Sequence, residues 1–260
     1  MCLLLLLLLA ASLRGEGVEL VVRRTRLGTI TGLETVVGEV TLESYLGVPY
    51  AAPPLGALRF LPPAPAPDWP GGALAALQPA PACPQLGGGG VVGAEDCLAL
   101  NIFTPAGAEG LAVMVWVHGG AFIKGSSSDG QYGPELLVAE GVLLVTLNYR
   151  LGALGWLTTL EAEAPGNLGL RDVALALAWV RDNIAGFGGD PGRVTVFGQS
   201  AGSMAISALL TMEQEAAPFH RAILQSGTLA RCKHDRHAKN RISGHTKFCG
   251  HFKFKMANKI

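Results

Sequence analysis

VTVFGQSAG, residues 194–202, joins an apolar, β-branched run to a second apolar run, SMAISALL, at 203–210. The first run is typical of a strand and the second of a helix, so Ser200 is expected on the sharp turn between them. Gly198 and Gly202 flank this turn. Glycine suits both positions, because the serine backbone is strained and a side chain two residues away would collide with a neighbouring element. The stretch therefore predicts a serine nucleophile at a strand-to-helix elbow.

Strands and helices alternate around this elbow. Runs typical of strands covered on both faces lie at 98–103, 111–117 and 142–149, and helical patterns lie at 133–140 and 170–185. The second helical pattern has charged residues that mark its ends: Arg171, Asp172, Arg181 and Asp182. This alternation predicts an α/β fold, with a mostly parallel central sheet and helices on both faces.

The part of the chain before these runs has a different pattern. Segments 18–33 and 38–51 are rich in β-branched residues and are expected to form an antiparallel meander. A stretch rich in Pro, Ala and Gly follows at 51–93 and is expected at the surface. Strands thus come first, and the alternating elements follow.

Composition indicates a globular, exported protein. With 260 residues, 49% of them hydrophobic and 15% charged, the chain can bury a sizeable core, which excludes a disordered or fibrous protein. The apolar run at 2–11 is too short to span a bilayer but suits a secretory signal, with cleavage expected between Ala11 and Gly17. A buried N-terminal helix is the alternative. No later apolar run is long enough for a membrane anchor, so residues 1–17 predict secretion.

Several further segments, in a fixed order, make a resemblance specific. Together with the elbow, the sequence is similar to the type-B carboxylesterase and cholinesterase family of α/β-hydrolases, over residues 18–230. The segments that carry the likeness are EDCLALN (95–101), VWVHGGAF (115–122), LNYRLGALGWL (147–157), WVRDNIAGFGGDP (179–191) and RAILQSGT (221–228). The resemblance implies the N-terminal part of an α/β-hydrolase domain and a secreted serine carboxylesterase that acts on a small-molecule ester without a cofactor.

The same resemblance assigns the groups that act on the ester. It implies Ser200 as the nucleophile and the backbone amides of Gly120, Ala121 and Ala201 as the oxyanion hole, with Gly119 shaping the loop. The residues agree, because a glycine-rich turn after a buried strand exposes bare amides to a substrate oxygen. Ala121 stands where many members have a third glycine, so its methyl group should crowd the acyl side.

Two structural pairs are also implied by the resemblance. Arg59 should pair with Glu95, and Cys83 should form a disulfide with Cys97 that closes a surface loop. Export makes such oxidation plausible. The loop contains no aromatic residue, so we expect no cation–π site for a quaternary ammonium and no preference for acetylcholine.

The partners of the serine are the open question. The family places the triad acid and histidine beyond the last residue of this chain, so we expect neither in it. The acids and histidines after the elbow have no matching context: Glu213, Glu215, Asp235, His220, His234, His237, His245 and His251. His220 is expected at the surface. The chain as written is therefore expected to be inactive, and the alternatives are a truncated product without function or a non-catalytic cholinesterase-like recognition domain.

Composition changes abruptly after residue 230. Residues 1–230 carry 11 Lys and Arg against 19 Asp and Glu, whereas residues 231–260 carry 9 against 1. We interpret 231–260 as a divergent, basic and disordered tail. A nucleic-acid-binding tail is one alternative. The other is a metal site built from Cys232, His234, His237, His245, Cys249 and His251. The C-x-H spacings do not match those of zinc sites, so we expect neither metal nor nucleic acid.

Overall fold

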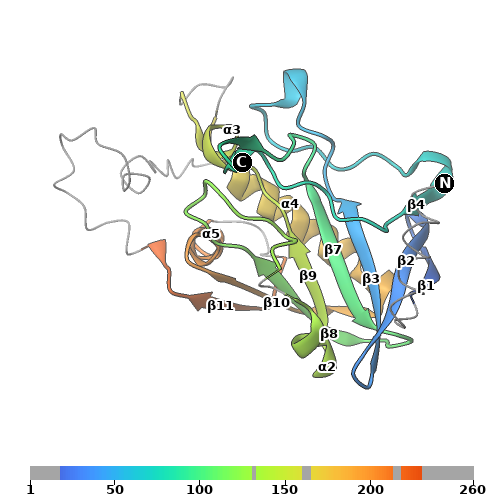
Figure 1. Cartoon of the computed structure of the whole chain (residues 1–260). Coiled ribbons are helices and arrows are strands. Elements are labelled where there is room, and N and C mark those ends of the chain that lie inside the picture. Colours follow the sequence, from blue (N-terminus) through green and yellow to red (C-terminus); the bar gives the residue numbers. More distant parts are fainter. Residues whose placement is uncertain (1–17, 131–132, 160–164, 213–217, 230–260) are drawn as a thin grey trace.

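The computed structural model describes residues 18–130, 133–159, 165–212 and 218–229. The predicted leader and basic tail lie outside these ranges. A nine-stranded sheet forms the centre of the molecule (Figure 1), and its main path runs β1-β2-β3-β7-β9-β8-β10-β11. No helix among the described residues is long and apolar enough to cross a membrane.

The first half of this sheet is antiparallel. Its strands are β1 (Glu19–Thr25), β2 (Gly28–Val37), β3 (Val40–Pro49) and β7 (Ala99–Pro105), and each pairs antiparallel with the next. Connections of two residues, at 26–27 and 38–39, turn the chain straight back and so permit only antiparallel pairing. The predicted meander is confirmed. The short strand β4 (Ala73–Ala75) pairs parallel with β2.

Parallel pairing is confined mainly to the other half. There β9 (Leu143–Leu147), β8 (Leu111–Val117), β10 (Gly189–Gln199) and β11 (Arg221–Gln225) pair parallel in this spatial order, whereas β7 pairs antiparallel with β9. The sheet is therefore mixed, and the expectation of a mostly parallel sheet is wrong in this respect. The prediction counted only the alternating segments, where long crossovers allow parallel neighbours.

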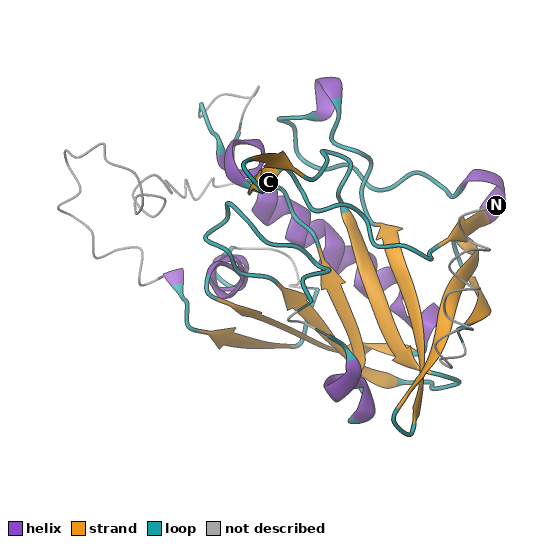
Figure 2. Ribbon diagram, viewed as in Figure 1, coloured by secondary structure: helices purple, strands orange, loops and turns teal. Residues whose placement is uncertain are grey.

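Helices cover both faces of the sheet, as predicted (Figure 2). The α-helices are α2 (Glu135–Ala139), α3 (Gly152–Trp156), α4 (Leu168–Asn183) and α5 (Ala201–Leu209), and the 3₁₀ helices are η1 (Gly56–Leu58), η2 (Pro70–Gly72) and η3 (Ile184–Phe187). Side chains of β8 alternate between the faces. Val115 and Val117 join the large core with α4 and α5, whereas Trp116 joins a smaller core with Val138 of α2.

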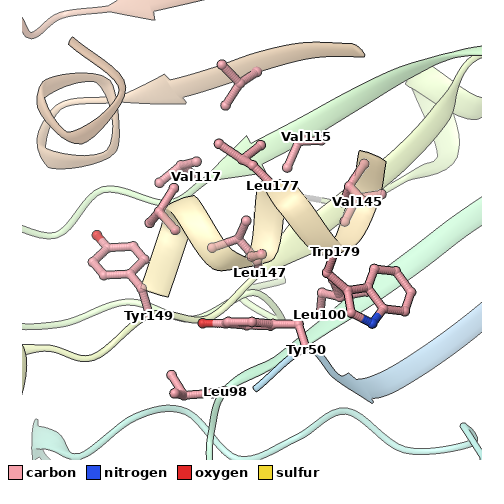
Figure 3. Close-up of a cluster of buried hydrophobic side chains, with 14 of the residues drawn as sticks. Tyr50, Leu98, Leu100, Val115, Val117, Val145, Leu147, Tyr149, Leu177 and Trp179 are labelled. Atoms are coloured by element: carbon pink, nitrogen blue, oxygen red, sulfur yellow. The ribbon is translucent and has the colours of Figure 1, made fainter. Parts of the chain in front are cut away.

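Figure 3 shows how the large core is built. Side chains of β8 and β9, among them Val115 and Leu147, point toward α4, which contributes Leu177 and Trp179. Tyr50 and Tyr149 lie at the margin of the same cluster and are fully buried. This core fixes the positions of β8, β9 and α4 relative to one another.

A buried ion pair corrects one prediction. Asp172 does not mark the helix end: it is 0% exposed and binds Arg150, with Arg150 Nη2 to Oδ1 at 2.7 Å and Nε to Oδ2 at 2.8 Å. The remaining guanidinium nitrogen of Arg150 donates to the carbonyls of Arg59 and Leu61. Helix α4 begins at Leu168, so Asp172 lies one turn inside it and faces the core.

Segment 51–93, expected at the surface, is largely exposed but buries Trp69, Ala76 and Cys83, and it contains a hairpin. The hairpin pairs β5 (Gln85–Gly87) with β6 (Gly90–Val92). Glycines 88 and 89 form its turn, with φ of 58° and 88°. Its side chains are exposed at Leu86 and Val91.

Candidate active site

The elbow forms where β10 meets α5. Ser200 is the residue before the helix and has φ 55° and ψ −118°, a conformation that costs about 1–3 kcal/mol in a non-glycine residue. Its N–H donates to the carbonyl of Gln225 in β11 at 2.8 Å, and its carbonyl accepts from Met204 at 3.0 Å. These two bonds hold the backbone in the strained turn. The serine side chain therefore stands at the carboxyl end of the parallel strands.

Close packing explains the glycines on both sides of Ser200. A Cβ at Gly202 would lie 2.0 Å from the carbonyl oxygen of Val117, and one at Gly198 would lie 2.6 Å from the same oxygen. Real Cβ atoms do not approach backbone so closely. The predicted collision is therefore confirmed, and the obstructing element is the end of β8.

The glycine-rich loop after β8 runs beside this serine. A Cβ placed on Gly119 would lie 3.4 Å from the Cβ of Ser200. Backbone bonds from Ile123 and Lys124 to the Gly120 carbonyl, at 3.0 and 3.1 Å, close a turn over 120–124. Inside it, Ala121 has φ 54°. We call residues 119–124 the oxyanion turn.

Backbone amides remain available at the predicted oxyanion positions. Among the described residues, no acceptor pairs with the N–H groups of Gly120 and Ala121. Ala201 begins α5, and the first N–H groups of a helix have no partner within it. Unpaired donors beside a serine hydroxyl can stabilise negative charge that develops on an attacked carbonyl oxygen.

His118 supports this turn from behind. Its ring is 1% exposed, stacks on Tyr149 with centroids 4.4 Å apart, and places Nδ1 2.8 Å from the Gly119 carbonyl oxygen. Tyr149 also donates its hydroxyl to the His118 carbonyl at 2.8 Å. Burial lowers the pKa of His118 to about 4, so the ring is neutral at pH 7. Since a carbonyl accepts only from a protonated nitrogen, Nδ1 carries the proton.

His220 lies at the wrong end of the strands to act on the serine. The parallel register sets Thr195 opposite Arg221 and Gln199 opposite Gln225. His220 therefore lies opposite Val194, six residues before Ser200, which is roughly 20 Å along the strand direction at about 3.3 Å per residue. It is exposed, as predicted, and binds the backbone of Val194. The other histidines and the three acids considered above lie outside the described residues.

The two implied structural pairs are present in the structure. Cys83 and Cys97 form a disulfide with Cα atoms 5.1 Å apart. Arg59 Nε lies 2.6 Å from Glu95 Oε2, and this hydrogen bond raises the pKa of the guanidinium. Within the described ranges, no three His, Cys, Asp or Glu residues gather to hold a metal ion.

Buried asparagines hold the loop that follows the oxyanion turn, and motif reasoning missed them. Asn148 accepts from the Ser127 N–H at 2.8 Å and donates to the carbonyls of Pro81 and Cys97. Asn101 donates toward the Ser127 hydroxyl at 3.3 Å. The sequence signal is an asparagine within each of two apolar runs, 98–103 and 142–149. It has no meaning until the fold brings the two runs together.

Comparisons with known proteins place this geometry among esterases. Residues 19–258 match the family model described as Carboxylesterase family. The chain is 46% identical over 222 residues to fumonisin B1 esterase of Sphingopyxis macrogoltabida, covering 81% of this chain and 40% of that protein. It is 43% identical to carboxylesterase 4A of Bos taurus, and the match covers 78% of this chain and 40% of that protein. It is 40% identical to cholinesterase of Mus musculus, and the match covers 87% of this chain and 40% of that protein.

Solved structures agree. Juvenile hormone esterase from Manduca sexta, with OTFP covalently attached, superposes with a TM-score of 0.76 at 41% identity, covering 82% of this chain and 42% of that one. PNB esterase gives a TM-score of 0.72 at 44% identity, covering 80% and 44%. The predicted fold class is confirmed. The chain spans about two fifths of the length of the curated relatives it matches.

Proposed function

The chain belongs to the carboxylesterase family, and from this premise we propose that Ser200 is the nucleophile of carboxylic ester hydrolysis. The amides of Gly120, Ala121 and Ala201 are the proposed donors to the oxyanion, and Gly119 lets the turn pass beside the serine. The observation that carries the proposal is the contact between two backbone turns, in which the Gly119 Cβ position lies 3.4 Å from the Ser200 Cβ.

The proposed reaction has two stages. Ser200 Oγ attacks the ester carbonyl carbon while a base removes its proton, and the carbonyl oxygen becomes an oxyanion bound by the three amides. Collapse of the tetrahedral intermediate breaks the bond to the alkoxy oxygen, which leaves as an alcohol with the proton from the base. Water then attacks the acyl-serine in the same way, so the products are a carboxylic acid, an alcohol and free serine.

We further propose that the described residues supply no base for this reaction. His118 is buried, neutral and bonded to the Gly119 carbonyl, and His220 lies at the opposite end of β10. Without a base the serine hydroxyl is a poor nucleophile, and loss of one triad member costs nearly as much as loss of all. The described part of the chain is therefore expected to show no ester turnover by itself.

Secretion is part of the proposal. The apolar run at 2–11 resembles a secretory signal. The Cys83–Cys97 bond supports it as well, since disulfides persist in oxidising compartments. The proposed partner is a small-molecule carboxylic ester, and the described residues suggest no preference for a particular acyl or alcohol group.

Hydrolysis of p-nitrophenyl acetate tests the proposal. Two proteins are compared: residues 18–260, and residues 18–229 fused to the C-terminal part of a carboxylesterase-family relative. Each is paired with its Ser200→Ala form and checked by circular dichroism. We expect Ser200-dependent turnover only from the fusion. Folded fusion protein without it would contradict the assignment of Ser200, and Ser200-dependent turnover by residues 18–260 would show that a base lies in the tail.

A further inference from the structure

The side chain of Gln85 joins two loops that are distant in sequence. Its Nε2 donates to the Gly125 carbonyl at 2.9 Å, and its Oε1 accepts from the Gly125 N–H at 2.9 Å. The same Nε2 donates to the carbonyl of Cys83 at 3.0 Å. A side-chain amide thus makes both hydrogen bonds of one backbone residue, which fixes that residue in distance and in orientation.

Gly125 is packed directly against the start of the oxyanion turn. A Cβ on it would lie 2.3 Å from His118 Nδ1 and 2.8 Å from the Gly119 carbonyl oxygen. Gly120 is equally close to the end of the turn, since its own Cβ position lies 2.0 Å from the Lys124 carbonyl oxygen. The turn is therefore closely packed throughout. Because no space separates Gly125 from Gly119, or Gly120 from Lys124, a displacement of Gly125 must also displace Gly119 and Gly120.

The backbone segment that carries Gln85 is firmly anchored. Gln85 follows Cys83 by two residues, and the Cys83–Cys97 disulfide closes this segment. Cys97 is buried, and its carbonyl accepts from Asn148 at 3.1 Å. The loop closed by the disulfide is thus a fixed support, and Gln85 is the side chain through which it holds the oxyanion turn.

We propose that Gln85 is a positioning residue for the oxyanion turn: it fastens Gly125 to the disulfide-closed loop and so keeps the amides of Gly120 and Ala121 directed beside Ser200. This inference rests on the proposed function for its catalytic meaning. These two amides have no acceptor among the described residues, so their direction is set by the turn that carries them. Gln85 touches no reacting atom and acts through Gly125.

Amide hydrogen exchange on residues 18–260 tests the tether without requiring activity. Gln85→Met keeps the side-chain length and removes all three bonds, whereas Gln85→Glu keeps an acceptor for the Gly125 N–H but not the donor. Gln78→Met is the control, because Gln78 is exposed and its side chain makes no hydrogen bond within the described structure. We expect the Gly125 amide to exchange about tenfold faster in Gln85→Met, since one hydrogen bond is lost. Unchanged exchange at Gly125 would overturn the tether.

A second readout separates positioning from plain stability. In the fusion protein described above, the rate constant for Ser200 labelling by a fluorophosphonate should fall about tenfold in Gln85→Met, with the melting temperature and the Ser127 amide, which Asn148 holds, little changed. Faster exchange with an unchanged labelling rate would overturn the positioning role. If unsubstituted fusion protein is not labelled at all, the proposed function fails, and the exchange result alone then decides whether Gln85 holds the turn.

Discussion

The elbow and the neighbouring edge strand β11 are built very differently, although one hydrogen bond from Ser200 to Gln225 joins them. At the elbow, Gly198, Ala201 and Gly202 are buried, and β8 leaves no room for a side chain at either glycine. In β11 burial alternates, Ile223 is 44% exposed, and among the described residues the strand pairs only with β10 (Figure 1).

This difference separates the parts of the proposed chemistry. Strands β8 and β10 and helix α5 carry the strained serine and the oxyanion turn, while the Gln225 carbonyl of β11 binds the serine N–H and the Gln85 side chain binds Gly125 next to the turn. After β11, the Gly227 carbonyl accepts from the Ser203 hydroxyl of α5. The proposed nucleophile thus lies in the interior of the sheet, whereas the described residues offer no base beside it.

The largest expected effect comes from filling the elbow. Gly202→Ala places a methyl group 2.0 Å from the Val117 carbonyl oxygen, so either β8 or α5 must move. We expect a loss of more than about 4 kcal/mol in the free energy of unfolding, or no folded protein. Gly90→Ala is the control, because a Cβ there meets nothing within 4 Å. Equal urea midpoints for Gly202→Ala and Gly90→Ala would show that the elbow has room for a side chain and would contradict its close packing.

Breaking the buried ion pair should be nearly as costly. Asp172→Asn leaves the 2%-exposed Arg150 side chain without its counter-charge, which should cost about 3–5 kcal/mol. Asp182→Asn is the matched change on the same helix. Its partner, Arg181, is 53% exposed, so a loss of about 0–1 kcal/mol is expected. Chemical denaturation of both variants measures the difference, and a small loss for Asp172→Asn would show that the interior tolerates a lone guanidinium.

Acid should act through the histidine behind the oxyanion turn. The pKa of His118 is lowered to about 4, while that of an unfolded histidine is about 6.5. The unfolded chain therefore takes up the proton first, and stability should fall by roughly 3 kcal/mol between pH 6.5 and 4. His118→Asn should flatten this part of the pH profile, and His220→Asn, at the β11 edge, should retain it. A profile that is unaffected by His118→Asn would contradict the neutral, buried ring.

The smallest effect on stability is expected from removing one methylene group, either from helix α5 of the elbow or from the edge strand β11. Ile206 of α5 is 0% exposed and Ile223 of β11 is 44% exposed. Ile206→Val should cost about 1 kcal/mol because it leaves a cavity, and Ile223→Val should change stability by less than about 0.5 kcal/mol. Thermal melts of both variants measure this. A larger loss from Ile223→Val would mean that β11 is covered.

Sequence periodicity was enough for the local elements but not for their assembly. The strand, serine and helix of the elbow follow from apolar patterning and two glycines. The antiparallel half of the sheet was underestimated, because pairing across β7 and β9 joins segments about forty residues apart. Asp172 was expected to mark a helix end, and its burial could not be predicted because it depends on Arg150 from another element. Gln85 was invisible for the same reason: its partner is the backbone of Gly125.

Ser200 is the proposed nucleophile, held in place by the elbow and the oxyanion turn. The direct measurement is fluorophosphonate labelling of the fusion protein, with the modified residue identified by peptide mass spectrometry. We predict a label on Ser200 that disappears in Ser200→Ala and remains in Ser226→Ala, the exposed serine after β11. Labelling that survives Ser200→Ala, or that maps to another serine, would contradict the account.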